Sequence, residues 1–213
     1  MRIHIPNRMA FVAMMAVLAT FAARSPARAG STTTLFEIQI DSTTAGLAAG
    51  SGGLLDIQLN PSTVPSSANV SAVVYNLSTN LTLGAPTTTG DASGQLQPGT
   101  SDKVTLDNGN KYNDLNQSAD LPASSYLDVT VAITVTDPTA TGASGTAFYL
   151  SLYDKNLSDP SATAILTVQS DGSVTQSTTA GVTITTLPEP STLAMLGLGL
   201  GAIAMVGRRG RAA

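Results

Sequence analysis

Apolar and polar residues alternate singly along many short stretches of this chain. The longest stretch covers residues 127–135, where Leu, Val, Val, Ile and Val occupy every second position and Asp, Thr, Ala and Thr lie between them. Successive side chains of a β-strand point to opposite faces of its sheet, so this pattern predicts a strand with one buried face. Similar alternation predicts further strands at residues 36–40, 55–59, 70–77, 103–107, 148–153, 163–169 and 181–186.

Turn-forming dipeptides separate these stretches, and no segment keeps a helical period for more than a turn or two. Asn108-Gly109 and Asp171-Gly172 are the best candidates for tight hairpins, because these residue types tolerate positive φ angles. Residues 84–101 are rich in Gly, Pro and Thr and are expected to form a loop. We therefore predict an all-β domain, an antiparallel β-sandwich of the jelly-roll or immunoglobulin-like type with about eight to ten strands.

The first 29 residues have the pattern of a secretory signal helix. Two arginines precede an uncharged, largely apolar run at residues 9–23, which is shorter than the ~20 residues that cross a bilayer. Small residues Ala27 and Ala29 then occupy the −3 and −1 positions of a signal peptidase site, which predicts cleavage before Gly30. The alternative is that residues 1–29 remain attached as an anchor helix.

The C-terminus combines three features in a fixed order. Pro188, Glu189 and Pro190 are followed by an uncharged apolar run at residues 191–207. These seventeen residues would form about 26 Å of helix, enough for a thin hydrocarbon core, so a transmembrane helix is predicted here. The arginines that close the chain are expected to stay in the cytoplasm and to orient the helix: Arg208, Arg209 and Arg211.

This tail resembles the PEP-CTERM sorting domain in its Pro-Glu-Pro triplet, its apolar helix and its terminal arginine cluster. The resemblance implies a Gram-negative bacterial protein that an exosortase, a membrane cysteine protease-transpeptidase, cuts near the triplet. The protein would then pass to the cell surface or the exopolysaccharide matrix. Signal peptidase, exosortase and, transiently, the membrane would be its partners. The chain thus divides into a signal peptide (1–29), a β-sandwich domain (30–187) and a sorting tail (188–213).

Composition excludes several kinds of chemistry from residues 30–187. The chain has no Cys, and its single His, His4, lies in the predicted signal peptide. The mature domain therefore cannot carry Ser-His-Asp or Cys-His catalysis or the usual zinc and copper sites, and we expect no cofactor. Its thirteen acids and three lysines give a formal charge of −10 without any arginine. Such a domain repels phosphate backbones, which argues against nucleic acid as a partner.

Three functions remain to be compared for this domain. A non-catalytic structural or adhesive role needs only export, a sorting tail and a stable, acidic, hydroxyl-rich exterior. A carbohydrate-binding module needs aromatic side chains that stack on sugar rings, and Tyr149 and Tyr153 on the outer face of one predicted strand are the candidates. Ordinary half-buried sheet tyrosines are the alternative interpretation of this pair. A carboxylate-dependent glycoside hydrolase needs two suitably placed acids, which no motif assigns. We expect the first function and no catalytic residue.

Oxygen-bearing side chains also gather in one short segment, which raises the question of calcium. The segment contains Asp102, Asp107, Asn108, Asn110 and Asp114. It does not match the EF-hand pattern, which requires Gly at the sixth position and Glu at the twelfth. A solvated hairpin loop is therefore the favoured interpretation, and we assign no metal site.

Overall fold

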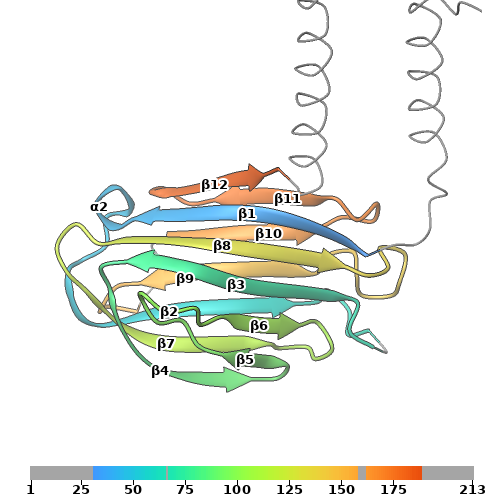
Figure 1. The fold of residues 1–213 in the computed structure, drawn as a ribbon, viewed down its shortest axis with the longest axis horizontal. Helices are drawn as coiled ribbons and strands as arrows, with labels where there is room; N and C mark the ends of the chain where they lie inside the picture. The colour runs from blue at the N-terminus through green and yellow to red at the C-terminus, as the bar shows by residue number, and fades with distance from the viewer. Residues whose placement is uncertain (1–30, 66, 158–161, 189–213) are drawn as a thin grey trace, which may run out of the picture. The chain divides into compact units, whose positions relative to one another are not determined.

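The computed structural model describes residues 31–65, 67–157 and 162–188. These residues form a β-sandwich of two antiparallel six-stranded sheets, which confirms the predicted fold class (Figure 1). The predicted signal peptide and the whole tail after Pro188 lie outside the described residues.

Both sheets combine strands from distant parts of the chain. The first sheet has the spatial order β12 (Val182–Leu187), β1 (Thr32–Asp41), β8 (Tyr126–Val135), β3 (Val70–Thr79), β6 (Val104–Asp107) and β5 (Ala92–Gly94). The second sheet has the order β11 (Val174–Thr178), β10 (Ala162–Val168), β9 (Ala147–Tyr153), β2 (Gly50–Asn60), β7 (Asp114–Leu121) and β4 (Thr82–Thr89). A single helical turn, α2 (Ser42–Ala45), follows β1.

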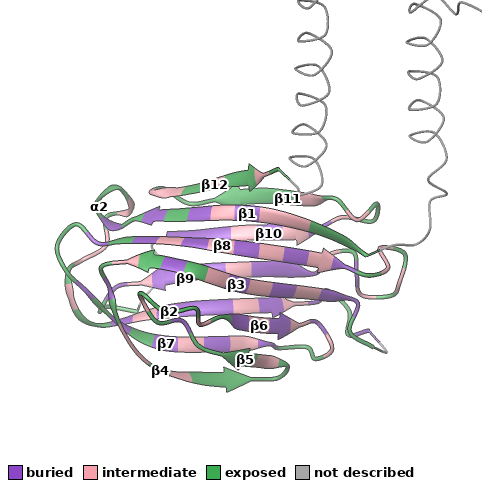
Figure 2. Cartoon of the chain, in the orientation of Figure 1, coloured by how far each residue is buried: buried purple, intermediate pink, exposed green. Residues whose placement is uncertain are grey.

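The apolar faces of the two sheets enclose one core, as the alternation predicts. In β8, every second residue from Leu127 to Val135 is at most 2% exposed. From the other sheet, Phe148, Leu150 and Leu152 of β9 enter the same core and are fully buried. Figure 2 shows the resulting bands of buried and more exposed residues along the strands. Burial of these side chains is the main source of stability, at about 25 cal/mol per Å² of apolar surface.

The described residues contain twelve strands, more than the eight to ten expected. All eight strands that alternation predicted are present, and the four others are β4, β5, β7 and β11. The expectation of a loop throughout residues 84–101 is wrong, because β4 continues to Thr89 and β5 covers Ala92–Gly94. β4 shifts its register against β7 between Leu83 and Pro86, and this irregularity removes the alternation that would have revealed the strand.

One of the two predicted hairpins is confirmed. Asp171-Gly172 lies in the turn that joins the paired strands β10 and β11, and Gly172 has a φ of +81°. The prediction for Asn108-Gly109 is wrong, since β6 pairs in the first sheet and β7 in the second. The chain crosses between the sheets at this point, and the Asn108 side chain is buried in the crossing.

Candidate functional site

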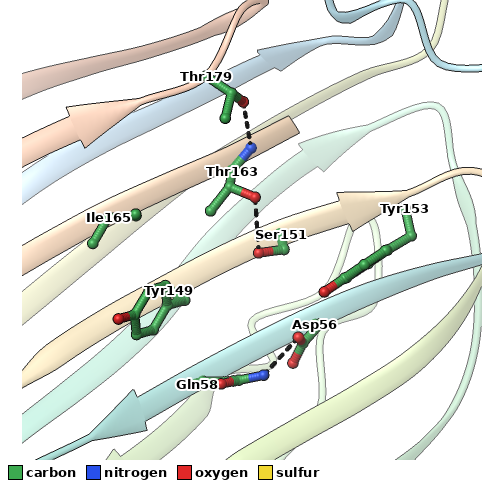
Figure 3. A pocket seen from close by; sticks show the side chains of 8 residues that line it. All are labelled: Asp56, Gln58, Tyr149, Ser151, Tyr153, Thr163, Ile165 and Thr179. Atoms are coloured by element: carbon green, nitrogen blue, oxygen red, sulfur yellow. Dashed lines mark hydrogen bonds between the residues drawn. The ribbon is translucent and has the colours of Figure 1, made fainter. Parts of the chain in front are cut away.

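A hollow lies on the outer face of the second sheet, which points away from the core (Figure 3). It has a volume of about 370 Å³ and is formed by β2, β9, β10 and the residue that follows β11. None of its lining side chains is cationic, so it suits neutral or positively charged ligand groups better than anionic ones. The lining residues are Asp56, Gln58, Tyr149, Ser151, Tyr153, Thr163, Ile165 and Thr179.

Strand alternation places both candidate tyrosines in this hollow. The neighbours of Tyr149, Ser151 and Tyr153 along β9 are buried in the core, so these three side chains face outward. Tyr149 pairs with Gln58 of β2, and Ser151 pairs with Asp56. The Cα atoms of the two tyrosines, four residues apart on one strand, are separated by roughly 13 Å. The structure therefore brings both rings to one face, with polar groups between them.

Hydrogen bonds fix the polar side chains of the hollow. The Thr163 N–H donates to Thr179 Oγ1 at 2.8 Å, and Thr163 Oγ1 donates to Ser151 Oγ at 3.1 Å. Gln58 Nε2 donates to Asp56 Oδ2 at 2.7 Å (Figure 3). Side chains that are already fixed lose little conformational entropy when a ligand binds, so this surface is preorganised.

Asp56 has the most perturbed environment in the hollow, since its side chain is only 5% exposed. Burial is the main cause that raises the pKa of Asp56 from 3.8 to about 7. The negative charge of Asp114 and a side-chain hydrogen bond with Asp114 raise this pKa too, whereas the bond from Gln58 lowers it. Asp114 lies on β7, where Asn116 Nδ2 donates to both of its carboxylate oxygens at 2.7 Å. We call Asp56 and Asp114 the carboxyl pair.

Sequence reasoning did not single out Asp56 or its hydrogen-bond partner Gln58. Alternation identifies both as outward residues of a strand, and outward acids are normally exposed. The burial of Asp56 comes from β7 and β9, which flank β2 in the sheet but lie far away in the sequence. The one available signal was an aspartate between Leu55 and Ile57, in the middle of a largely apolar strand.

The carboxyl pair does not have the geometry of a glycosidase. Retaining glycosidases hold their two carboxyl groups about 5–5.5 Å apart, and inverting ones about 6.5–9.5 Å apart, on either side of the bond that is cut. Asp56 and Asp114 are instead diagonal neighbours on one face of the β2–β7 ladder, where Asp56 lies opposite Asn116 and Asp114 lies opposite Gln58. Two carboxyl groups side by side on one face of a sheet are not placed on either side of a glycosidic bond. The hydrolase alternative therefore gains no support from this hollow.

The oxygen-bearing residues considered for calcium do not converge on one point. Asp102 Oδ2 accepts a hydrogen bond from Gln95 Nε2 at 2.9 Å, Asn108 is buried between the sheets, and Asp114 belongs to the carboxyl pair. In the described part of the chain, no group of three or more Asp, Glu, His or Cys side chains is placed to hold a metal ion.

The start of the sorting tail adjoins the edge of the first sheet. Leu187, the last residue of β12, pairs with Leu35 of β1, and the next residue, Pro188, is exposed. Among the described residues no helix is long and apolar enough to cross a membrane, and the helix predicted at 191–207 lies beyond them. The other predicted processing residues also lie outside the described ranges: Ala27, Ala29, Gly30, Glu189, Pro190, Arg208, Arg209 and Arg211.

Comparison with known proteins identifies this tail. No curated protein and no solved structure matches the chain. The family model of the PEP-CTERM protein-sorting motif matches residues 186–211, which contain the Pro-Glu-Pro triplet, the apolar run and the arginine cluster. The matched segment begins within β12, so no spacer separates it from the sandwich. The chain is therefore an exported protein that carries a PEP-CTERM protein-sorting motif, the membrane-associated signal through which an exosortase processes its substrates.

Proposed function

We propose that residues 30–187 are the mature protein and that they serve a non-catalytic structural or adhesive role at the cell surface or in the exopolysaccharide matrix of a Gram-negative bacterium. The observation that carries this proposal is the position of the sorting motif, which begins at the end of β12. The sandwich domain therefore precedes the motif in the chain and is the part of the protein that the motif would sort. The outward faces of its strands carry mainly Thr, Ser and Asp, which suits a protein that works in water outside the cell.

Processing follows from the chemistry of the two ends. Signal peptidase removes residues 1–29, and the exosortase cuts close to Pro188. Proline fixes its own φ and lacks an N–H donor, so a segment with two prolines cannot extend the sheet and stays open to an enzyme. The terminal arginines, which are costly to move through lipid, hold the tail in the membrane until it is cut.

The sorting proposal is tested by truncating the chain after Leu187 in the bacterium that produces it. The complete chain is expected in the surface or matrix fraction, with an intact mass that lacks both ends. The truncated chain is expected as soluble protein in the medium or the periplasm. Arg211→Lys, which keeps the positive charge, serves as the control and should be sorted normally. A truncated chain that reached the matrix as efficiently as the complete one would contradict the proposal.

Binding of a polysaccharide is a second function, which the hollow on the second sheet favours. The half-buried rings of Tyr149 and Tyr153 lie on either side of Ser151 along β9, and the polar groups of Asp56 and Gln58 lie beside them. Sugars present apolar C–H faces that stack on aromatic rings and hydroxyl groups that form hydrogen bonds, so both kinds of contact are available here. Because the lining has no cation, neutral or amino-bearing glycans fit better than anionic ones.

Glycan binding is tested on an array of neutral, amino-bearing and anionic polysaccharide fragments with the purified protein. Tyr149→Ala is expected to weaken binding about tenfold, because it removes one stacking surface. Tyr126→Ala is the matched control, since Tyr126 is 47% exposed but belongs to the first sheet. If neither Tyr149→Ala nor Tyr153→Ala changed the binding of any fragment, the tyrosines would be ordinary sheet residues. The sorting proposal would be unaffected.

A further inference from the structure

The Asp56 carboxylate has a hydrogen-bond donor for only one of its two oxygens when it is ionised. Oδ2 accepts from Gln58 Nε2 at 2.7 Å. Oδ1 is buried and receives no hydrogen bond from any donor among the described residues. Burying a charged oxygen without a donor is costly, because nothing replaces the water that it loses. The position therefore favours a protonated Asp56.

The strand register supplies an acceptor for that proton. β2 and β7 pair with Gln58 opposite Asp114 and Asp56 opposite Asn116, which makes Asp56 and Asp114 diagonal neighbours on the outer face of the sheet. Asn116 Nδ2 contacts both oxygens of Asp114 and holds this carboxylate in place. The side chains that line the hollow include no cation that could balance two negative charges. Two carboxylates that are neighbours on one face of the sheet then repel each other strongly when both are ionised.

We propose that Asp56 and Asp114 share one proton, and that the O–H···O bond between them fastens β2 to β7 and makes the second sheet sensitive to pH. In the protonated state Asp56 donates from Oδ1 to Asp114 while Oδ2 still accepts from Gln58, so each oxygen of Asp56 has a partner. When the proton leaves, two negative charges face each other across the β2–β7 ladder. The carboxyl pair needs no ligand, so this proposal is independent of glycan binding.

The direction of the pH dependence follows from the environment of Asp56. Burial, followed by the charge and hydrogen bond of Asp114, raises its pKa from 3.8 to about 7 in the folded protein. Between these two values the folded chain holds a proton that the unfolded chain has already lost. Stability from the shared proton is therefore fully present below the lower value and disappears as the pH rises through about 7.

Few other titratable groups face Asp56. From β7 the neighbour is Asp114, and from β9 the neighbours are the phenols of Tyr149 and Tyr153. Phenol groups as a class are uncharged in this pH range, so they add no competing charge. Burial and the charge of Asp91 also raise the pKa of Asp107 on β6, so the contribution of the carboxyl pair is the part of the pH dependence that substitution of Asp56 removes.

Thermal unfolding between about pH 5 and about pH 8 tests the proposal, with Asp56→Asn as the main variant. Asparagine keeps an acceptor for Gln58 and offers an N–H donor to Asp114 at every pH, so it imitates the protonated acid permanently. Wild-type protein is expected to lose roughly 3–8 °C in melting temperature as the pH rises through this range. Asp56→Asn should lose much less and should melt above wild type at the upper pH. Asp120→Asn is the control, because Asp120 is an exposed acid on the same face of β7 and the change in net charge is the same.

A second variant and a direct titration complete the test. Asp114→Asn should also flatten the pH dependence, because its N–H can donate to an ionised Asp56. The carboxyl carbon of Asp56, followed by NMR, should titrate near pH 7 in wild type and at a lower pH in Asp114→Asn. A carbon that titrated near the ordinary aspartate value would overturn the proposal. So would an Asp56→Asn protein with the same pH dependence as Asp120→Asn.

Discussion

The side chain of Asn108 is completely buried and makes five hydrogen bonds. Its Oδ1 accepts from the N–H groups of Asn69 and Val70 at 2.9 and 3.1 Å. Its Nδ2 donates to Asn69 Oδ1 at 2.8 Å and to Thr146 Oγ1 at 3.1 Å. One amide thus joins the start of β3, the crossing after β6 and the turn before β9.

Asn108→Ala is expected to lower the free energy of unfolding by about 2–4 kcal/mol, because it leaves buried donors and acceptors without partners. Denaturant unfolding of the purified protein measures the change. Asn110→Ala, at an exposed position two residues away, is the control and should change stability by less than about 0.5 kcal/mol. Equal effects of the two substitutions would show that the Asn108 hydrogen bonds do not stabilise the crossing.

The sequence predicts the environment of some of these residues but not of others, because a strand pattern reports local properties and not contacts with distant strands. Tyr149 and Tyr153 share an outer face because the period of two along one strand is a local property. The burial of Asp56 and Asn108 is set by strands that arrive from remote parts of the chain. Asn108 precedes a glycine and lies in a turn as predicted, but the turn does not close a hairpin, and the sequence does not reveal that the Asn108 amide is buried and bonded to Asn69, Gly142 and Thr146.

Neighbouring strands approach each other closely around Gly53 of β2. A Cβ atom at this position would lie 2.5 Å from Leu121 Cδ1 of β7 and 2.7 Å from the Tyr153 carbonyl oxygen of β9. The register of β2 against β7 also shifts between Gly50 and Gly53. The strands on both sides therefore leave space for a hydrogen atom only.

Gly53→Ala is expected to reduce the free energy of unfolding by about 2–3 kcal/mol, because β7 or β9 must move to admit a methyl group. Gly99→Ala is the control: its φ is +74° and nothing lies within 4 Å of the added Cβ, so only backbone strain of about 1 kcal/mol applies. Chemical denaturation of both variants gives the comparison. A smaller loss for Gly53→Ala than for Gly99→Ala would mean that the sheet adjusts freely at this point.

Strands with regular alternation were predictable, whereas strands with polar inward positions were not. β7 turns Gln117 toward the interior, where its Nε2 donates to the carbonyl oxygens of Gly84 and Leu96 at 2.9 and 3.1 Å. This amide bonds to the irregular backbone of β4 and of the segment after β5, and it interrupts the apolar row that identifies a strand. β11 escapes prediction for the opposite reason, since most of its residues are exposed and polar.

At the scale of the whole molecule, the class of the fold follows from the sequence, but the order of its strands does not. The chain has many short strands, each with one apolar face, and two sheets packed against each other bury these faces, which predicts a sandwich. The order within each sheet depends on pairings such as β1 with β8 and β12, which join the beginning of the domain to its middle and its end. The alternation along a strand carries no information about which strand lies beside it.

The tail follows β12 without a linker, and this limits the orientation of the processed protein on the molecule or surface to which it would be attached. Leu187 is held in the sheet by its pairing with Leu35, and each further extended residue adds only about 3.3 Å. With cleavage close to Pro188, as proposed above, the new carboxyl end would project barely beyond the sandwich. Molecules coupled to a carrier through so short a link cannot tumble independently. Every copy would turn the same end toward its carrier, and a coat built from them would have a uniform outer surface.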